Sequence, residues 1–424
     1  MKSIVMLCAI LSVAWCASSG VARGQSLSDN AKQAAHQANQ FGWDLYHRLC
    51  AEQATRLPPK GNLFMSPYSI DTALAMTYGG ARGLTAQQMA TTLHFDQGAD
   101  LLHQAMGELI ADINSEQGAD PTKTFLLVVA NALWVQKGLA INPDYQKLVN
   151  GPYAAALRDV DFSGGPAAIE RSRQTINDWV AKQTQDKIKD LLAKGTVDAA
   201  TQLVLTNAIY FKSVWQTPFD KKATRDEAFH TGVADVDVPM MHQKHKFAYT
   251  EGDGVQLLGL PYQNGLLTMV VVLPQKAEQF AEAEKALDAK KLDQWLGAMR
   301  TQEVVVSLPR FKFSTGFSLA TTLQAMGMTE AFRPGADYSG MLALVAGQPP
   351  SSLSISQVMH KAFIDVNEES TEAAGATGVV MRQTAIRREE PVTEFKADHP
   401  FVFMIRDNAS GVILFVGRVS NPKE

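Results

Sequence analysis

The chain has 424 residues, of which 46% are hydrophobic and 19% are charged. This composition is ordinary for a globular protein and excludes wholesale disorder, collagen and low-complexity chains. Lys and Arg number 39 against 43 Asp and Glu, so the formal net charge is −4 and the molecule as a whole does not attract nucleic acid. At roughly 150 residues per domain, length alone suggests two or three domains.

Residues 1–24 have the pattern of a secretory signal peptide. Lys2 precedes a short apolar run over residues 4–17, and small residues follow it, which predicts cleavage near Gly20 or Gly24 without fixing the bond. The run is too short for a comfortable transmembrane helix, and no later run approaches 18 apolar residues, so we expect no membrane partner. The protein is therefore expected to be secreted, or periplasmic in a bacterium; the alternative is a buried N-terminal helix.

Removal of this segment leaves one cysteine. Loss of Lys2 and Arg23 changes the net charge from −4 to −6, and Cys50 becomes the only cysteine of the mature chain. An exported chain without an internal disulfide needs a large hydrophobic core. A place in that core is favoured for Cys50 over a role as nucleophile.

Helical spacing and end signals predict six helical segments. They cover 31–54, a helix that starts at Ser66-Pro67 and stops at Gly79-Gly80, a helix with Thr85 and Gln88 as capping box, and 101–116, 167–192 and 277–299.

Dense runs of Val, Leu and Ile predict strands, several of them apolar at consecutive positions as in strands that are buried on both faces. They are Phe125–Val135, Leu203–Phe211, Leu266–Leu273, Val304–Leu308, Phe401–Ile405 and Val412–Val419. Because helices dominate the first third and strands the last half, the predicted class is α+β.

No motif commits the chain to enzymatic chemistry. A Gly-x-Ser-x-Gly elbow, a Walker loop and a Rossmann fingerprint are all missing. His242 and His245 could hold a metal, but no cysteine accompanies them and a solvated surface is favoured, so we expect neither metal nor cofactor. The three lysines at 182, 187 and 189 alternate with aspartates on a predicted helix, which does not favour a glycosaminoglycan cofactor.

Several motifs together resemble the serpin family, from about residue 30 to the end of the chain. They are NLFMSPYSI over 62–70, GGARGLT over 79–85, LTNAIYFK over 205–212 with Trp215, VNEESTEAAGAT over 366–377, DHPFVFMIR over 398–406, and ILFVGRV over 413–419 with Asn421-Pro422.

The resemblance implies one serpin domain over residues 25–424, with three β-sheets and eight or nine helices. It also implies an exposed reactive-centre loop over about 368–395, which a target serine protease cleaves. In the family the hinge of this loop then inserts into the central sheet and traps the acyl-enzyme, a switch by strand insertion. The implied protein is thus a secreted suicide inhibitor, a monomer at risk of loop–sheet polymers, and no enzyme; the alternative is a non-inhibitory serpin that acts as carrier or chaperone.

The resemblance also gives the cleaved bond by counting. Sixteen positions after the hinge glutamate Glu368, the bond falls at Thr384–Ala385, which favours an elastase-like or broad-pocket protease. A small shift would place Arg382, Ala385, Ile386 or Arg387 before the bond, and arginine there would suit a trypsin-like protease.

The expected hinge has the properties that insertion requires. It contains no proline, and every second residue from Thr371 to Met381 is uncharged, while Glu372 and Arg382 share the other face. Ser370 stands where the family usually has glycine, so its Cβ could slow the hinge. The hinge residues are Glu368, Ser370, Thr371, Glu372, Ala373, Ala374, Gly375, Ala376 and Thr377.

Two supporting clusters are carried over from the family. The shutter, beneath the central sheet, would hold Ser66, Ser69, Asn207 and His360. The breach, where the hinge first enters the sheet, would hold Trp215, Arg310 and Glu368, with an ion pair between the last two.

Overall fold

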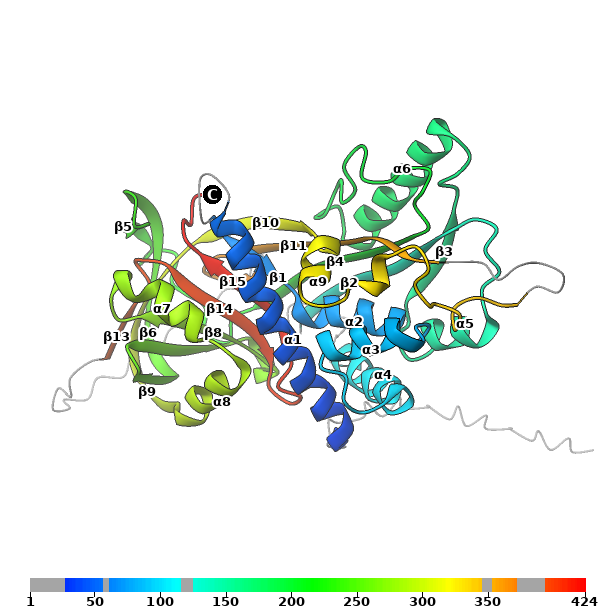
Figure 1. The fold of residues 1–424 in the computed structure, drawn as a ribbon. Coiled ribbons are helices and arrows are strands. Elements are labelled where there is room, and N and C mark those ends of the chain that lie inside the picture. The colour runs from blue at the N-terminus through cyan, green and yellow to red at the C-terminus, as the bar shows by residue number, and fades with distance from the viewer. Residues whose placement is uncertain (1–26, 56–60, 116–124, 345–352, 372–392) are drawn as a thin grey trace, which may run out of the picture.

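The computed structural model describes residues 27–55, 61–115, 125–344, 353–371 and 393–424. Within these ranges the chain forms nine α-helices and fifteen β-strands (Figure 1), and the predicted α+β class is confirmed. The expected signal segment, residues 1–24, lies outside them.

The described residues also form three short 3₁₀ helices, at Gln263–Gly265, Ala277–Gln279 and Glu330–Phe332. They are α1 (Asp29–Ala54), α2 (Pro67–Tyr78), α3 (Gly83–Thr92), α4 (Ala99–Ser115), α5 (Pro143–Asn150), α6 (Pro166–Gln183), α7 (Phe280–Ala286), α8 (Ala289–Ala298) and α9 (Ala320–Ala325).

All six predicted strands are present, most of them longer by a few residues. The strands are β1 (Leu63–Met65), β2 (Phe125–Gln136), β3 (Ala156–Val160), β4 (Leu203–Val214), β5 (Arg225–His230), β6 (Asp235–Gly252), β7 (Val255–Pro261), β8 (Leu267–Pro274), β9 (Arg300–Pro309), β10 (Phe311–Ser318), β11 (Ile355–Val366), β12 (Ser370–Thr371), β13 (Thr393–Lys396), β14 (Phe401–Asp407) and β15 (Ile413–Val419).

A six-stranded sheet has the order β10-β11-β12-β4-β2-β3. Its two faces pack against different helices, which lie on opposite sides of it in Figure 1. Leu133 and Leu205 belong to the main core together with α1, α2 and α4, whereas Trp134 and Val204 pack with Ile176 of α6. Because successive strand residues face opposite sides, both faces are apolar, and the consecutive apolar runs follow from that.

A nine-stranded sheet carries the order β1-β15-β14-β8-β7-β6-β9-β13, with β5 paired to β6. The 18-residue β6 pairs with β5 at its start, with β9 from Met240 to Tyr249 and with β7 at its end. Because β6 is long enough to pair with all three strands, continuous hydrogen bonding joins β5, β9 and β7 into one sheet. The family description, with three sheets, counts such strands as parts of separate sheets.

The helix predicted over 167–192 ends earlier, at Gln183 of α6. The Thr184 hydroxyl accepts from the backbone N–H of Ile188 (3.2 Å), and Gln185, Asp186 and Asp190 take left-handed backbone conformations that no helix continues. Ile188 and Leu191 remain buried, so their spacing reflected the core beneath them rather than a helix.

The segment 277–299 also differs from its prediction. It forms two helices, α7 and α8, because Asp288 caps the second one by accepting from the Lys291 N–H (2.7 Å). Thr85 and Gln88 lie inside α3 and form no capping box: their side chains accept from the N–H groups of Asp337 (2.9 Å) and Glu330 (2.8 Å).

The predicted start and stop of α2 are confirmed. Ser66 caps it through its hydroxyl, which accepts from the Ser69 N–H (3.1 Å), and Pro67 is its first residue. The helix ends before Gly79-Gly80, where a Cβ on Gly80 would come within 2.0 Å of Met341. Among the described helices, none is both long and apolar enough to cross a membrane.

Candidate functional site

The candidate site is the seam between β4 and β11 at the centre of the six-stranded sheet. The two strands are parallel and paired from Leu203 and Ile355 to Tyr210 and Phe363. Beyond that point they separate, and β12 lies between them: Thr371 pairs with Ser213 of β4 and with Val366 of β11. The seam is thus closed along most of its length and occupied by another strand at one end.

Polar residues cross the closed part of the seam in a single row. The register places Asn131 of β2 opposite Asn207 of β4, and Asn207 beside His360 of β11. Asn207 donates to Asn131 Oδ1 (2.5 Å) and its Oδ1 contacts His360 Nδ1. The contact between Asn207 and His360 bridges the seam, so a strand that entered between β4 and β11 would break it.

Ser66 and Ser69 connect this row to α2. The Ser66 N–H donates to His360 Nε2 (3.2 Å), and its hydroxyl donates to the carbonyl of Leu414 (2.6 Å). The Ser69 hydroxyl accepts from Asn207 and donates to Asn131 Oδ1 (3.2 Å). The structure therefore brings together all four residues expected in the shutter, and we use that name for these four and Asn131.

His360 is a neutral hydrogen-bonding group in this arrangement. Complete burial lowers its pKa to about 3, although the bond to Asn207 acts in the opposite direction. Its Nε2 accepts from Ser66, so Nδ1 carries the proton that faces Asn207. The shutter is fully hydrogen-bonded at this residue, which stabilises the closed seam.

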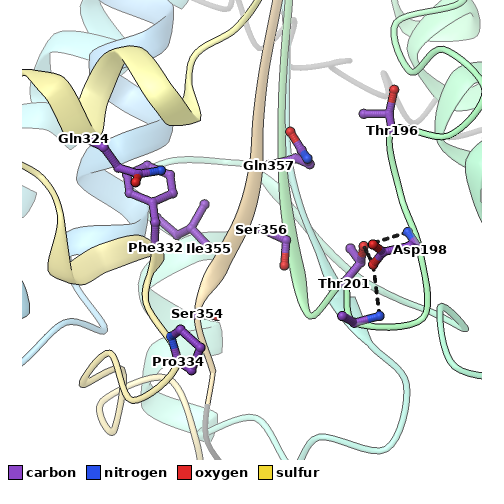
Figure 2. A pocket seen from close by; sticks show the side chains of 11 residues that line it. Thr196, Asp198, Thr201, Gln324, Phe332, Pro334, Ser354, Ile355, Ser356 and Gln357 are labelled. Atoms are coloured by element: carbon purple, nitrogen blue, oxygen red, sulfur yellow. Dashed lines mark hydrogen bonds between the residues drawn. The ribbon is translucent and has the colours of Figure 1, made fainter.

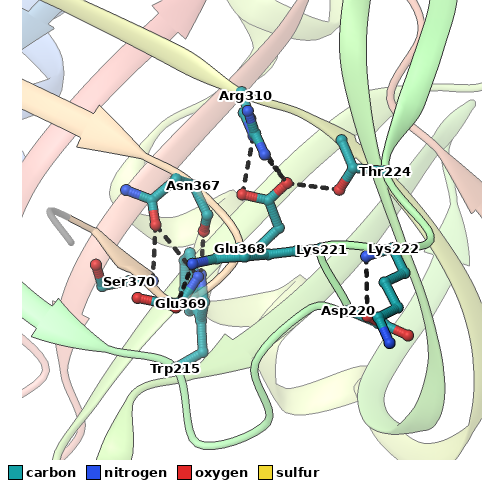
Figure 3. Close-up of polar contacts among 10 residues, drawn as sticks. All are labelled: Trp215, Asp220, Lys221, Lys222, Thr224, Arg310, Asn367, Glu368, Glu369 and Ser370. Atoms are coloured by element: carbon teal, nitrogen blue, oxygen red, sulfur yellow. Dashed lines mark hydrogen bonds and ion pairs between the residues drawn. The ribbon is translucent and has the colours of Figure 1, made fainter. Parts of the chain in front are cut away.

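The expected ion pair of the breach is present where the chain leaves β11 (Figure 3). Arg310 Nε lies 2.8 Å from both carboxylate oxygens of Glu368, and Thr224 donates to Oε1 (2.5 Å). The Glu368 side chain is 2% exposed and that of Arg310 is 42% exposed. Burial raises the pKa of Glu368, but Arg310 and Thr224 outweigh it, so the net pKa is lowered and the carboxylate is charged at neutral pH.

Further contacts hold the turn between β11 and β12. Trp215 Nε1 donates to the carbonyl of Asn367 (2.8 Å), and its backbone N–H donates to that of Glu369 (3.0 Å). The Glu369 carboxylate pairs with Lys221 (Figure 3). The three residues predicted for the breach therefore come from three segments and meet at this turn: Glu368 lies on it, and Trp215 and Arg310 contact it.

The first two residues after this turn are already strand. Ser370 and Thr371 are buried, and the Thr371 hydroxyl bonds to the Tyr262 hydroxyl (2.7 Å), which fixes its side chain toward the core. Ser370 is absent from the described residues with positive φ. The Cβ of Ser370 therefore causes no left-handed backbone strain in this structure.

The other end of the seam borders a polar pocket of about 300 Å³ (Figure 2). The pairing of β4 with β11 is irregular between Ile355 and Gln357, and there the Gln202 N–H donates to the Ser356 hydroxyl (3.0 Å). A side-chain bond thus replaces a backbone bond where the seam begins. The regular ladder is interrupted at both ends of the seam.

The remaining predicted residues have different outcomes. The reactive bond with its alternatives and hinge residues 372–377 lie outside the described residues, so their roles stay predictions.

Cys50 packs beside Glu284 and Arg418. Burial, and after it the charge of Glu284, raises the pKa of the Cys50 thiol to about 12, which disfavours a role as nucleophile. His242 and His245 lie in β6, where residues three apart face opposite sides, and the described residues contain no group of three metal-ligating side chains.

The lysines at 182, 187 and 189 do not share a helix. Of the three, Lys182 alone lies in α6. Lys187 Nζ lies over the rings of Tyr210 and Phe363, and Lys189 Nζ lies 3.7 Å from Asp186 Oδ1. Lys187 and Lys189 lie outside the helix because α6 ends at Gln183.

Two residues of the site were missed at the sequence level. Asn131 is the only amide in an apolar run of eleven residues, and a lone polar residue in a buried strand is a usable signal for a hydrogen-bonded cluster. Thr224 lies in a turn before β5 and carries no such signal.

The comparisons with known proteins agree with this geometry. The family described as Serpin (serine protease inhibitor) matches residues 36–422. An uncharacterized serpin-like protein of Thermococcus kodakarensis is 40% identical, covering 93% of this chain and 87% of its own, and the human leukocyte elastase inhibitor is 41% identical, covering 90% and 97%. The crystal structure of human thyroxine-binding globulin complexed with thyroxine matches with a TM-score of 0.81 at 29% identity over 93% of this chain and 100% of that one. The chain belongs to the serpin family, and relatives such as the leukocyte elastase inhibitor are protease inhibitors and not enzymes.

Proposed function

We propose that this serpin is a secreted suicide inhibitor of serine proteases, in which cleavage of the reactive-centre loop allows the hinge to insert between β4 and β11. The position of β12 is the observation that carries the proposal. Two residues of the hinge already form a strand at the open end of the seam: both pair with β4, and Thr371 also pairs with β11. Further insertion only has to extend a strand that has begun.

The register of β12 predicts how far that strand would extend. Thr371 is opposite Ser213, and continued antiparallel pairing would bring Met381 opposite Leu203, the first residue of β4. Arg382 would then lie just beyond the end of the sheet. The stretch from Thr371 to Met381, in which Glu372 is the only charge, therefore matches the length of the strand that it would join.

The side chains fit the same register. Thr371 points toward Tyr262 and the core, so residues of the same parity, 373 to 381, would face the core as well. They are Ala, Gly, Thr, Val and Met, without a charge. Glu372 would face the opposite side, toward the side of the sheet that α6 covers, so no charge would be forced into the main core.

The proposed cleavage site is Thr384–Ala385, and the proposed target is an elastase-like or broad-pocket serine protease. The likeness to leukocyte elastase inhibitors supports this choice. Export rests on the apolar run at residues 4–17, and N-terminal sequencing of the protein recovered from outside the cytoplasm should begin close to residue 21 or 25.

Mixing with elastase, subtilisin, trypsin and chymotrypsin tests the mechanism. A band at the summed mass that survives boiling on a denaturing gel is expected with at least one protease. Mass spectrometry of the released C-terminal peptide should give Ala385 as its first residue; a later residue would place the bond elsewhere. Cleavage by every protease without a stable adduct would favour the alternative, a non-inhibitory carrier, for which the likeness to thyroxine-binding globulin is the supporting observation.

A further inference from the structure

Asp71 of α2 is a buried carboxyl group without a hydrogen-bond donor. The residue is 1% exposed, and neither Oδ1 nor Oδ2 has a partner among the described residues. The other buried acids of the described chain do have donors: Glu368 has Arg310 and Thr224, Glu284 has Arg418 and Tyr46, and Asp407 has Ser410. An acid in this position is costly when charged, since a buried carboxylate needs a counter-charge or several donors.

Among the residues that the structure describes, no cation acts on the Asp71 carboxyl group. The titratable groups beside it are Tyr68 on its own helix and Tyr153 after α5. These two tyrosines in turn interact with Asp407 at the end of β14, Tyr145 of α5 and His103 of α4. Tyr68 and Tyr153 interact with Asp71 directly. His103 contacts the Tyr153 hydroxyl (2.6 Å), and the charge of Arg82 acts on His103 and Asp337. His103 is itself held neutral, because burial lowers its pKa to about 4.

The protonated acid is therefore the form that fits this site. Burial alone raises the pKa of Asp71 well above its ordinary value. In the unfolded chain an aspartate has a pKa of about 3.9. The folded protein thus binds more protons than the unfolded chain above that pH, and its stability falls as the pH rises from about 4 toward the raised pKa.

The helix that carries Asp71 also carries part of the shutter. Ser69, two residues earlier, bonds to Asn131 and Asn207 across the sheet, and Ser66 bonds to His360. A charged Asp71 can be hydrated only if α2 moves away from α4 and the segment after α5. Such a movement displaces the serines that hold the closed seam.

We propose that Asp71 is a proton-controlled switch on the shutter: its protonated carboxyl lets α2 pack and keeps the seam closed, and loss of the proton loosens α2 and promotes opening of the seam. The uncleaved protein should then lose its native form faster as the pH rises. The inference concerns the stability of the uncleaved protein and does not depend on whether it inhibits a protease.

Asp71→Asn tests the proposal, because it keeps the shape of the side chain and cannot ionise. The rate at which the full-length protein loses its native form on mild heating is measured from about pH 4 to 9. The two proteins should convert at similar rates near pH 4, and the wild type should then become faster relative to the variant by up to tenfold per pH unit. Asp178→Asn, at an exposed position of α6, should follow the wild type throughout.

A constant ratio of the two rates across this pH range would overturn the proposal. Asp71→Ser serves as a second variant with the same expectation, in case the asparagine protein does not fold. The wild type itself gives an independent readout: a carboxylic acid carbonyl band should persist in its infrared spectrum at neutral pH, and its absence would contradict a protonated Asp71. Polymers on native gels should form faster at alkaline pH in the wild type only; a stability change without this effect would refute the link to the shutter.

Discussion

The pairing of Glu368 with Arg310 makes a prediction that can be developed quantitatively. Glu368→Gln removes the negative charge of a side chain that is 2% exposed and has three charge-assisted contacts with Arg310. Loss of one partner of a fully buried pair costs roughly 3–5 kcal/mol, but Arg310 reaches solvent and can be hydrated. We therefore expect a loss of about 1–3 kcal/mol in the stability of the native state.

The neighbouring residue supplies a matched control. Glu369 pairs with Lys221, whose side chain is 62% exposed, and exposed pairs contribute below about 1 kcal/mol. Denaturant midpoints of the native-state transition should therefore fall clearly for Glu368→Gln and little for Glu369→Gln. Equal shifts for the two variants, or no shift for the first, would refute the argument from burial. Glu368→Lys, which adds a second cation beside Arg310, should form polymers after mild heating; gels with monomer alone would count against it.

Three other predictions concern the shutter, the hinge and acid. His360→Ala leaves the buried groups of Ser66 and Asn207 without a partner, at about 1–3 kcal/mol each, and should speed polymer formation on native gels; an unchanged rate would show that this row does not hold the seam. Thr371→Arg should turn the protein into a substrate that is cleaved without an adduct, because its side chain is buried against Tyr262, while Thr371→Ser should keep the adduct. The pKa of Glu368 is lowered on folding, so its contribution to stability is fully present above a pH of about 4.3. That contribution is lost as the pH falls through the pKa of Glu368 in the folded protein. Glu368→Gln should lack this acid-dependent loss of stability, measured by Trp fluorescence.

Much of the fold was predictable because local signals agreed with burial. Ser66-Pro67 predicted the start of α2, and consecutive apolar residues predicted β2 and β4 of the six-stranded sheet. The errors arose where the same apolar spacing has two structural meanings. Ile188 and Leu191 continue the spacing of α6 although the chain around them has left the helix, since both still lie over the sheet.

The site was predictable only through the family resemblance. Nothing local in the sequence indicates that Ser66, Asn207 and His360 meet, because they lie on separate segments that only the register of β4 and β11 brings together. The partial insertion of Ser370 and Thr371 could not be predicted either, since it depends on where β4 and β11 separate. Asp71 directly follows the NLFMSPYSI motif, but its lack of a hydrogen-bond partner among the described residues is visible only in the three-dimensional structure.

The thermal unfolding of intact and loop-cleaved protein tests most directly whether the seam between β4 and β11 accepts the hinge. A non-target protease cleaves the loop, and the unfolding temperature is measured before and after. The account predicts that the cleaved protein unfolds at a much higher temperature, because a new central strand pairs on both sides, and that cleaved Thr371→Arg shows no such rise. Cleaved wild-type protein that unfolds at the same temperature as the intact protein would contradict insertion, and with it the proposed mechanism of inhibition.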